Sequence, residues 1–152
     1  SRTAFEDKKD MIFLPYHTLS TNSKRQQMVN YLRSLPFVKY QEEKQSVEEY
    51  YHSMDQYKFV IGLEGSGPDI HRNYETMLIG SIPINIKNII KDVFDQHGAI
   101  GIFLDSWGEL DKILFNKLLR TEYNTSKNES FLRLKNHISY VRGVIGKNAR
   151  PS

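Results

Sequence analysis

Short apolar runs alternate with amphipathic segments along most of this chain, and this alternation limits its fold more than any other feature. Runs that are nearly all apolar are typical of strands buried on both faces of a sheet. The run at residues 58–63 has this character most clearly, and four further short, mainly apolar runs occur at residues 11–14, 37–40, 81–86 and 100–104. The segments between them carry apolar residues at the i, i+3, i+4 and i+7 spacing of helices. Strands and helices alternating in this way predict right-handed βαβ units.

The predicted fold class is α/β: a single Rossmann-like, open and mostly parallel sheet of about five strands with helices on both faces. A chain of 152 residues is long enough for one such domain with a core, and too short for two. We expect a polar lead-in at residues 1–10, the domain at 11–145 and a tail at 146–152. The helices are expected at residues 28–35, 47–54, 70–79, 88–97, 106–119 and around 131–141.

Composition excludes several classes of protein. The net charge is only +3, and the basic residues are dispersed, so neither a nucleic-acid groove nor a polybasic membrane patch is indicated. No apolar stretch approaches the roughly 20 residues needed to cross a bilayer. With no cysteine, the chain has no disulfide, no thiol nucleophile and no Cys-based zinc site, which fits a reducing compartment. We therefore expect no nucleic-acid partner and no membrane segment in this chain.

The loop after the third predicted strand is the strongest candidate for a binding site. Ligands of open α/β sheets bind beyond the carboxyl ends of the strands. Three loops lie there, at residues 15–22, 64–70 and 104–108. In the middle loop, Gly65 and Gly67 flank Ser66, so the backbone can approach a ligand closely. The helix that follows points its free N–H groups at the same place, which predicts an anion site.

Charged side chains around this loop suit a diphosphate with a sugar on each side. Arg72 can grip a phosphate with two donors, and His71 can donate to a phosphate or a sugar hydroxyl. Glu75 shares a helix face with His71 and can accept from the hydroxyls of a ribose. Glu64, at the strand end, can reach the other sugar or stabilise positive charge there. A plain glycine turn followed by an ordinary helix cap would leave the same local pattern, so both interpretations stay open.

A series of short motifs follows one another along residues 57–86. A strand ending in Glu-Gly leads into a glycine loop, an Asp, a His-Arg pair and a helix with a Glu, and Gly-x-x-Pro then enters the next strand. The residues that carry this order are Glu64, Gly65, Ser66, Gly67, Asp69, His71, Arg72, Glu75, Gly80 and Pro83. The block resembles the donor-binding signature of exostosin-like glycosyltransferases and, more distantly, that of α1,3-fucosyltransferases. Thr21, Asn22, Arg25 and the pair Tyr50-Tyr51 resemble family features more loosely.

The resemblance implies the C-terminal, nucleotide-sugar-binding half of a two-domain GT-B glycosyltransferase. It places Arg72 on the diphosphate, Glu75 on the ribose and Glu64, as the catalytic residue, near the transferred sugar. The remaining donor-binding residues would be Thr21, Asn22, Arg25, Gly65, Ser66, Gly67, Asp69 and His71. The donor would be a UDP- or GDP-sugar, with no cofactor. No Asp-x-Asp motif is present, which agrees with metal-independent chemistry.

Two departures from the family pattern, together with the chain length, limit which properties of the family can be expected of this chain. Ser81 stands where the family usually has Cys or another small residue. The resemblance also allows a setting in the Golgi lumen, but the absence of cysteine does not support transferring it to this chain. A GT-B enzyme places its active site between two Rossmann-like domains, of which this chain can supply one. We therefore expect a carbohydrate acceptor and the N-terminal GT-B domain of a parent chain as partners. The chain starts at Ser1 rather than Met, as an excised part would.

The alternative is a non-catalytic, flavodoxin-like or receiver-like interaction domain. A receiver requires acidic residues after the first strand and a phospho-acceptor Asp after a central one, where this chain has Pro15-Tyr16 and Glu64-Gly65. A flavodoxin requires a phosphate loop rich in Ser and Thr, which residues 17–22 match loosely. Asp105 and Trp107 follow the fifth strand and either border the cleft or belong to the start of the next helix.

Overall fold

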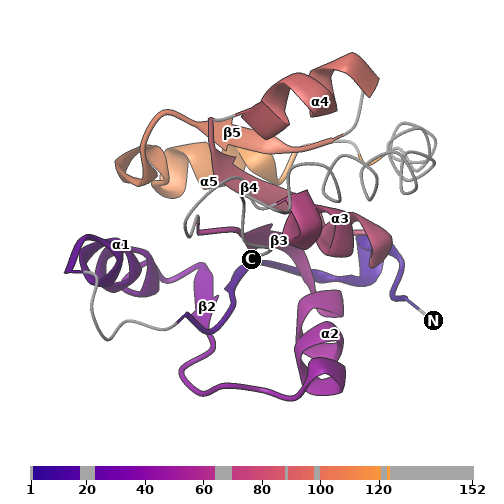
Figure 1. Cartoon of the computed structure of the whole chain (residues 1–152), viewed down its shortest axis with the longest axis horizontal. Coiled ribbons are helices and arrows are strands. Elements are labelled where there is room, and N and C mark those ends of the chain that lie inside the picture. The colour runs from indigo at the N-terminus through magenta and orange to yellow at the C-terminus, as the bar shows by residue number, and fades with distance from the viewer. Residues whose placement is uncertain are drawn as a thin grey trace, which may run out of the picture.

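Five parallel strands form one open sheet in the order β2-β1-β3-β4-β5. The computed structural model describes residues 2–17, 23–63, 70–87, 89–97, 100–120 and 123. The strands are β1 (Lys9–Leu14), β2 (Val38–Tyr40), β3 (Tyr57–Ile61), β4 (Ile82–Ile86) and β5 (Ile102–Leu104). In Figure 1, β2 lies toward the lower left and β5 toward the top. The predicted fold class is confirmed.

Helices cover both faces of the sheet, as parallel strands require for their crossovers. The elements are α1 (Ser23–Arg33), α2 (Val47–Asp55), α3 (Ile70–Leu78), α4 (Ile89–His97) and α5 (Lys112–Leu118), with short 3-10 turns η1 (Phe5–Asp7) and η2 (Trp107–Glu109). One face carries α1, η2 and α5, whose side chains share a single core cluster. The other face carries α2, α3 and α4.

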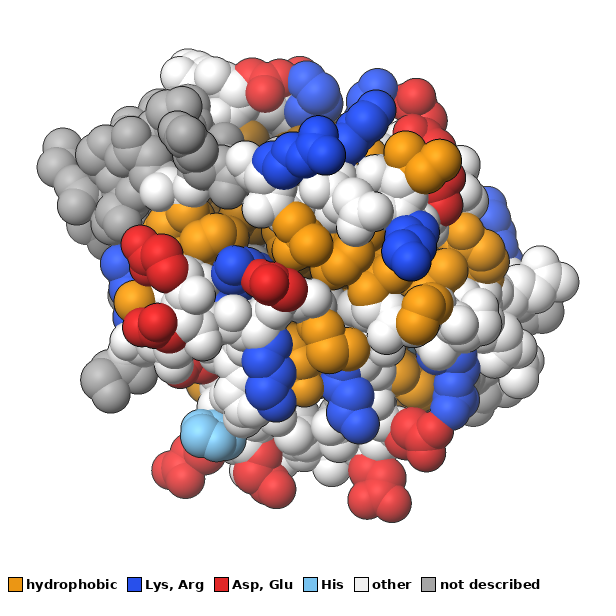
Figure 2. Space-filling view, turned by 180° about the vertical axis from the view of Figure 1, so that it is seen from behind, with side chains coloured by type: hydrophobic (Ala, Val, Ile, Leu, Met, Phe, Trp, Pro, Cys, Tyr) orange, Lys and Arg blue, Asp and Glu red, His pale blue; other side chains and the backbone are white. Residues whose placement is uncertain are grey.

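Alternate side chains of the strands point to opposite faces and build two core clusters. The larger joins strand residues to α1 and α5 and includes Ile12, Leu14, Val29, Leu32, Phe59, Ile61, Ile82, Ile84, Phe115 and Leu118. The smaller, under α2 and α3, consists of Phe13, Met54, Tyr57 and Val60. Figure 2 shows that hydrophobic side chains also reach the surface on the face seen from behind, between lysine and arginine side chains.

In the sheet, β1 lies between β2 and β3. Ile12 lies opposite Val38 of β2 and Phe59 of β3, and Phe59 lies opposite Ile82 of β4. After β1 the chain crosses to β2 on one side of it, and after β3 the chain crosses to β4 on the opposite side. The carboxyl ends of these two neighbouring strands are the point where the chain direction reverses, and ligands bind at such points in open α/β sheets.

The segment before β1 is anchored to the end of α2. The backbone N–H and the hydroxyl of Thr3 donate to Asp55, and Nζ of Lys8 lies 2.9 Å from Oδ1 of Asp55. The Lys8 side chain is fully buried, and this burial lowers its pKa. Burial of Asp55 acts to raise the pKa of its carboxyl, but the hydrogen bonds from Lys8 and Thr3 outweigh it and the pKa is lowered.

The prediction of a single helix over residues 106–119 is wrong. Ser106 and Glu109 do form the expected capping box, but it opens only the 3-10 turn η2. At Leu110 the backbone is extended, with φ −78° and ψ 91°, and its side chain is fully buried. Asp111 then caps α5 by accepting from the N–H of Leu114 at 2.8 Å. The extended residue Leu110 therefore separates η2 from α5, and its side chain lies in the core.

A buried pair of amides joins α3 to β4. Nδ2 of Asn85 donates to Oδ1 of Asn73 at 2.6 Å, and Nδ2 of Asn73 donates to Oδ1 of Asn85 at 3.3 Å. Both residues are 2% exposed. The neighbouring strand leaves room for the pair at Gly62, where an added Cβ would lie 2.7 Å from Oδ1 of Asn85. A glycine is therefore needed just beyond the end of β3.

We expect Gly62→Ala to lower the free energy of unfolding by about 1–3 kcal/mol, the usual cost of overpacking a buried site. Gly108→Ala is the matched control, because its Cβ would meet only Oγ of Ser106, at an ordinary 3.8 Å. That control should stay within about 0.5 kcal/mol of the unsubstituted protein. Urea unfolding monitored by circular dichroism measures both. Equal effects of the two substitutions would contradict the close approach at Gly62.

Candidate functional site

The candidate site is the edge of the sheet where β1 and β3 end. The segment that leaves β3 passes through Gly62 and Leu63 and re-enters the described structure at Ile70, the first residue of α3. The segment that leaves β1 begins with residues 15–17 and leads to α1. Both α1 and α3 therefore start at the carboxyl edge of the sheet, one on each face.

Several predicted site residues lie outside the described residues: Thr21, Asn22, Glu64, Gly65, Ser66, Gly67 and Asp69. The backbones of His71 and Arg72 lie in the first turn of α3, which confirms their predicted place on a helix. Their side chains are not described. Among the predicted residues, the structure therefore describes the side chains of Glu75 and Arg25.

The first turn of α3 is held in place by Asn73, through the amide pair with Asn85. Asn73 directly follows Arg72, so this contact fixes the part of the helix that carries the predicted anion site. Sequence reasoning did not identify either asparagine. The available signal was Asn85 itself, a polar residue in the apolar run of residues 81–86, because a buried amide requires a hydrogen-bond partner.

Glu75 is bound to the neighbouring helix. The hydroxyl of Tyr51, on α2, donates to Oε2 of Glu75 at 2.5 Å. Burial, the hydrogen bond to Glu75 and the charge of Glu75 together raise the pKa of Tyr51 to about 12. Tyr51 therefore remains a protonated donor at physiological pH and orients the carboxylate. A carboxylate has acceptor capacity for several hydrogen bonds, so a bond from Tyr51 is compatible with further acceptance from a ligand.

Tyr50 and Tyr51 both pack against the smaller core cluster as partly buried residues. Their rings lie 5.6 Å apart between centroids. The role of Tyr51 as a hydrogen-bond donor to Glu75 was not predicted. Its partner lies 24 residues further along the chain on another helix, so local spacing carried no signal for it.

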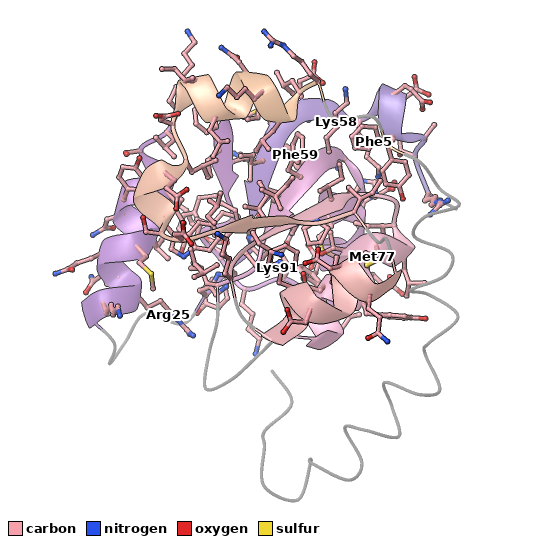
Figure 3. The ribbon with its side chains drawn as sticks, turned by 90° about the horizontal axis from the view of Figure 1, so that it is seen from above. Phe5, Arg25, Lys58, Phe59, Met77 and Lys91 are labelled. Carbon is pink, nitrogen blue, oxygen red and sulfur yellow. The ribbon has the colours of Figure 1, made fainter. Side chains whose placement is uncertain are left out.

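Arg25 and Glu75 lie on opposite sides of the sheet. Arg25 is in the first turn of α1, which packs on the face of the larger core cluster, whereas α3 packs on the other. Figure 3 shows Arg25 on the side of α1 and Met77, from α3, on the other side. A single ligand would have to cross the strand ends to contact both residues.

The end of β1 carries no acidic residue within residues 15–17. His17 is buried, and its Nδ1–H donates to the carbonyl of Pro15 at 2.6 Å. The end of β3 continues into Gly62 and Leu63. The described ends of these strands therefore lack the acidic cluster of a receiver domain.

Asp105 and Trp107 occupy different surroundings after β5. Asp105 is exposed, and its Oδ1 lies 2.9 Å from Nζ of Lys87. Trp107 is 6% exposed and belongs to the larger core cluster with Leu110 and Phe115. The packing of Trp107 at the start of the following helical segment is confirmed, and Trp107 also lines a groove beside α1.

Within the described ranges, no three His, Asp or Glu side chains come together in a way that could bind a metal ion. The helices described there are all too short or too polar to cross a membrane. Compared with known proteins, the chain matches no family model and no curated protein. Its fold class therefore stands on the structure alone.

We expect Tyr51→Phe to lower the free energy of unfolding by about 1 kcal/mol at pH 7, because the substitution removes a partly buried hydrogen bond to a carboxylate. The folded-state pKa of Tyr51, about 12, lies above the ordinary tyrosine pKa of about 10. The bond therefore stabilises the fold fully below about pH 10, and this contribution is lost as pH rises toward 12. Urea unfolding of both proteins between pH 7 and 11.5 tests this, and a difference that does not shrink at high pH would refute it.

Proposed function

We propose that this chain binds a nucleoside diphosphate sugar at the carboxyl ends of β1 and β3 and presents it for transfer to a carbohydrate acceptor. One observation carries the proposal. The block at residues 57–86, which resembles a donor-binding signature, contains α3, whose first turn lies at that edge of the sheet. A helix that begins there turns its free N–H groups and the positive end of its dipole toward a bound anion.

In this proposal, the predicted site residues bind different parts of the nucleotide sugar. The N–H groups of the first turn of α3, with Arg72 and His71, bind the diphosphate. Glu75, oriented by Tyr51, accepts hydrogen bonds from the ribose hydroxyls. The loop residues Gly65, Ser66, Gly67 and Asp69 surround the phosphates, while Thr21, Asn22 and Arg25 approach them from the α1 side. Glu64 contacts the transferred sugar.

The reaction breaks the bond between the anomeric carbon and the diphosphate oxygen, and forms a bond from that carbon to an acceptor hydroxyl. The acceptor loses a proton to a base, and the diphosphate leaves with the electron pair of the broken bond. Arg72 and the helix N-terminus stabilise the charge on the leaving diphosphate, so the chemistry proposed here uses protein groups rather than a metal. The base and most of the acceptor site would lie on a second, N-terminal GT-B domain.

The strand order favours a second candidate function. The order 2-1-3-4-5 is that of flavodoxin and of receiver domains. A flavodoxin-like interaction domain would bind a flavin phosphate at the same edge, through the segment between β1 and α1. Flavin absorbance in the purified protein, or tight binding of flavin mononucleotide in place of nucleoside diphosphates, would establish this alternative.

Titration calorimetry with UDP, GDP and their sugars tests the proposed function, and at least one of these ligands should bind. Arg72→Ala should weaken diphosphate binding at least tenfold, about 1.4 kcal/mol, because it removes charge-assisted hydrogen bonds to the phosphates. Arg120→Ala removes the same charge from an exposed position after α5 and should leave affinity unchanged.

Both arginine variants should unfold within about 0.5 kcal/mol of the unsubstituted protein. If no nucleotide binds a folded sample at millimolar concentration, the proposal is wrong. A large loss of stability in Arg72→Ala with unchanged affinity would instead assign Arg72 a structural role.

A further inference from the structure

A groove with a volume of about 460 Å³ separates α1 from the turn between β5 and η2. Met28 of α1, Ile86 at the end of β4 and Trp107 of η2 form its apolar part. Lys24 and Gln27 line it from α1, and Asp105 from the opposite side. Binding sites for small molecules usually enclose about 300–1,000 Å³ and combine apolar walls with a few polar groups, so this groove has a suitable size and lining.

Core packing and a hydrogen bond between the two walls hold the groove in shape. Trp107 is 6% exposed and is packed in the larger core cluster. Tyr31, which also lines the groove, is 38% exposed, and its hydroxyl donates to the carbonyl of Leu110 at 3.1 Å. That bond connects α1 to the residue that follows η2. The two sides of the groove are therefore held at a fixed separation.

The chemistry of the groove matches a pyranose ring. Such a ring has C–H groups that pack on aromatic and aliphatic side chains, and hydroxyls at its edge that need donors and acceptors. Met28, Tyr31 and Trp107 provide the first kind of surface. Gln27 offers both a donor and an acceptor, Lys24 offers donors and Asp105 offers acceptors.

The position of the groove also favours a sugar. The groove lies on the α1 face, at the carboxyl ends of β4 and β5, whereas Glu75 lies on the opposite face beside α2. If Glu75 binds the ribose, the nucleoside occupies the α2 and α3 side. The diphosphate then lies at the strand ends, and the carbohydrate end of the ligand points across them toward the α1 face.

We infer that the groove between α1 and the β5–η2 turn is a carbohydrate subsite that holds a pyranose ring, either the sugar of the donor or a sugar of the acceptor. The inference rests on the proposed function for its link to a nucleotide. The subsite itself is formed entirely by described residues, and of these only Ile86 belongs to the motif at residues 57–86. It gives a function to the segment at residues 104–108, which the donor signature leaves without one.

The groove can be tested through Trp107, the only tryptophan of the chain. Gln27→Tyr adds a bulky side chain to the groove and keeps Trp107 as the single tryptophan. Gln26→Tyr is the matched control, since Gln26 is a neighbouring exposed residue of α1 that does not line the groove. Tryptophan fluorescence, corrected for nucleotide absorbance, is titrated with UDP, GDP, UDP-glucose, UDP-galactose, UDP-N-acetylglucosamine, GDP-mannose and GDP-fucose, and with free tri- and tetrasaccharides. Matching unfolding midpoints establish that both variants are folded.

If the donor sugar occupies the groove, a nucleotide sugar should bind more tightly than its nucleotide, and Gln27→Tyr should weaken its binding about tenfold while leaving the nucleotide unchanged. If the acceptor occupies it, a free oligosaccharide should change Trp107 fluorescence, and the same variant should weaken that binding about tenfold. In both cases Gln26→Tyr should behave as the unsubstituted protein. Equal affinities in Gln27→Tyr and Gln26→Tyr for every ligand would overturn the inference.

The same titrations separate this inference from the proposed function. Nucleotide binding that is insensitive to Gln27→Tyr, with no oligosaccharide binding, refutes the subsite and leaves the donor site intact. Oligosaccharide binding that is sensitive to Gln27→Tyr, with no nucleotide binding, supports the subsite and refutes the donor site.

Discussion

Two buried amides determine where the start of α3 lies. Asn73 and Asn85 satisfy each other's hydrogen-bonding groups, and leaving either unpaired in the core would cost about 1–3 kcal/mol. The pair joins the first turn of the helix to the last part of β4, and Gly62 leaves the space in which it fits. The helix start therefore has a fixed position and direction at the strand ends. Every role proposed for His71, Arg72 and Glu75 depends on that position.

The layout of the fold could be predicted because its signals are local. A strand covered on both faces must be apolar at nearly every position, so the runs at residues 58–63 and 81–86 identify β3 and β4 directly. Element boundaries were less predictable. The capping box at Ser106 is real, yet a local pattern cannot distinguish a 3-10 turn from a longer helix. The burial of Leu110 decides the outcome, and burial depends on residues distant in the sequence.

The candidate site was predictable only in part, for a similar reason. The motif correctly placed His71 and Arg72 in the first turn of a helix at the sheet edge. The contacts that hold this helix and its carboxylate were not predictable, since their partners are separated by 12 residues for Asn73 and Asn85 and by 24 for Tyr51 and Glu75. Sequence spacing reports neighbours on one element. It does not report which side chains meet when different elements pack.

Both outer strands of the sheet are short. β2 and β5 contain three residues each, and they flank the longer strands β1, β3 and β4. An edge strand exposes unpaired N–H and C=O groups that can recruit a strand from another molecule, and a short edge is one way in which proteins limit this. Within the described part of the chain, the sheet therefore ends in edges that offer little template for self-association. A central region this rich in β-branched and aromatic residues would otherwise be prone to intermolecular pairing and aggregation.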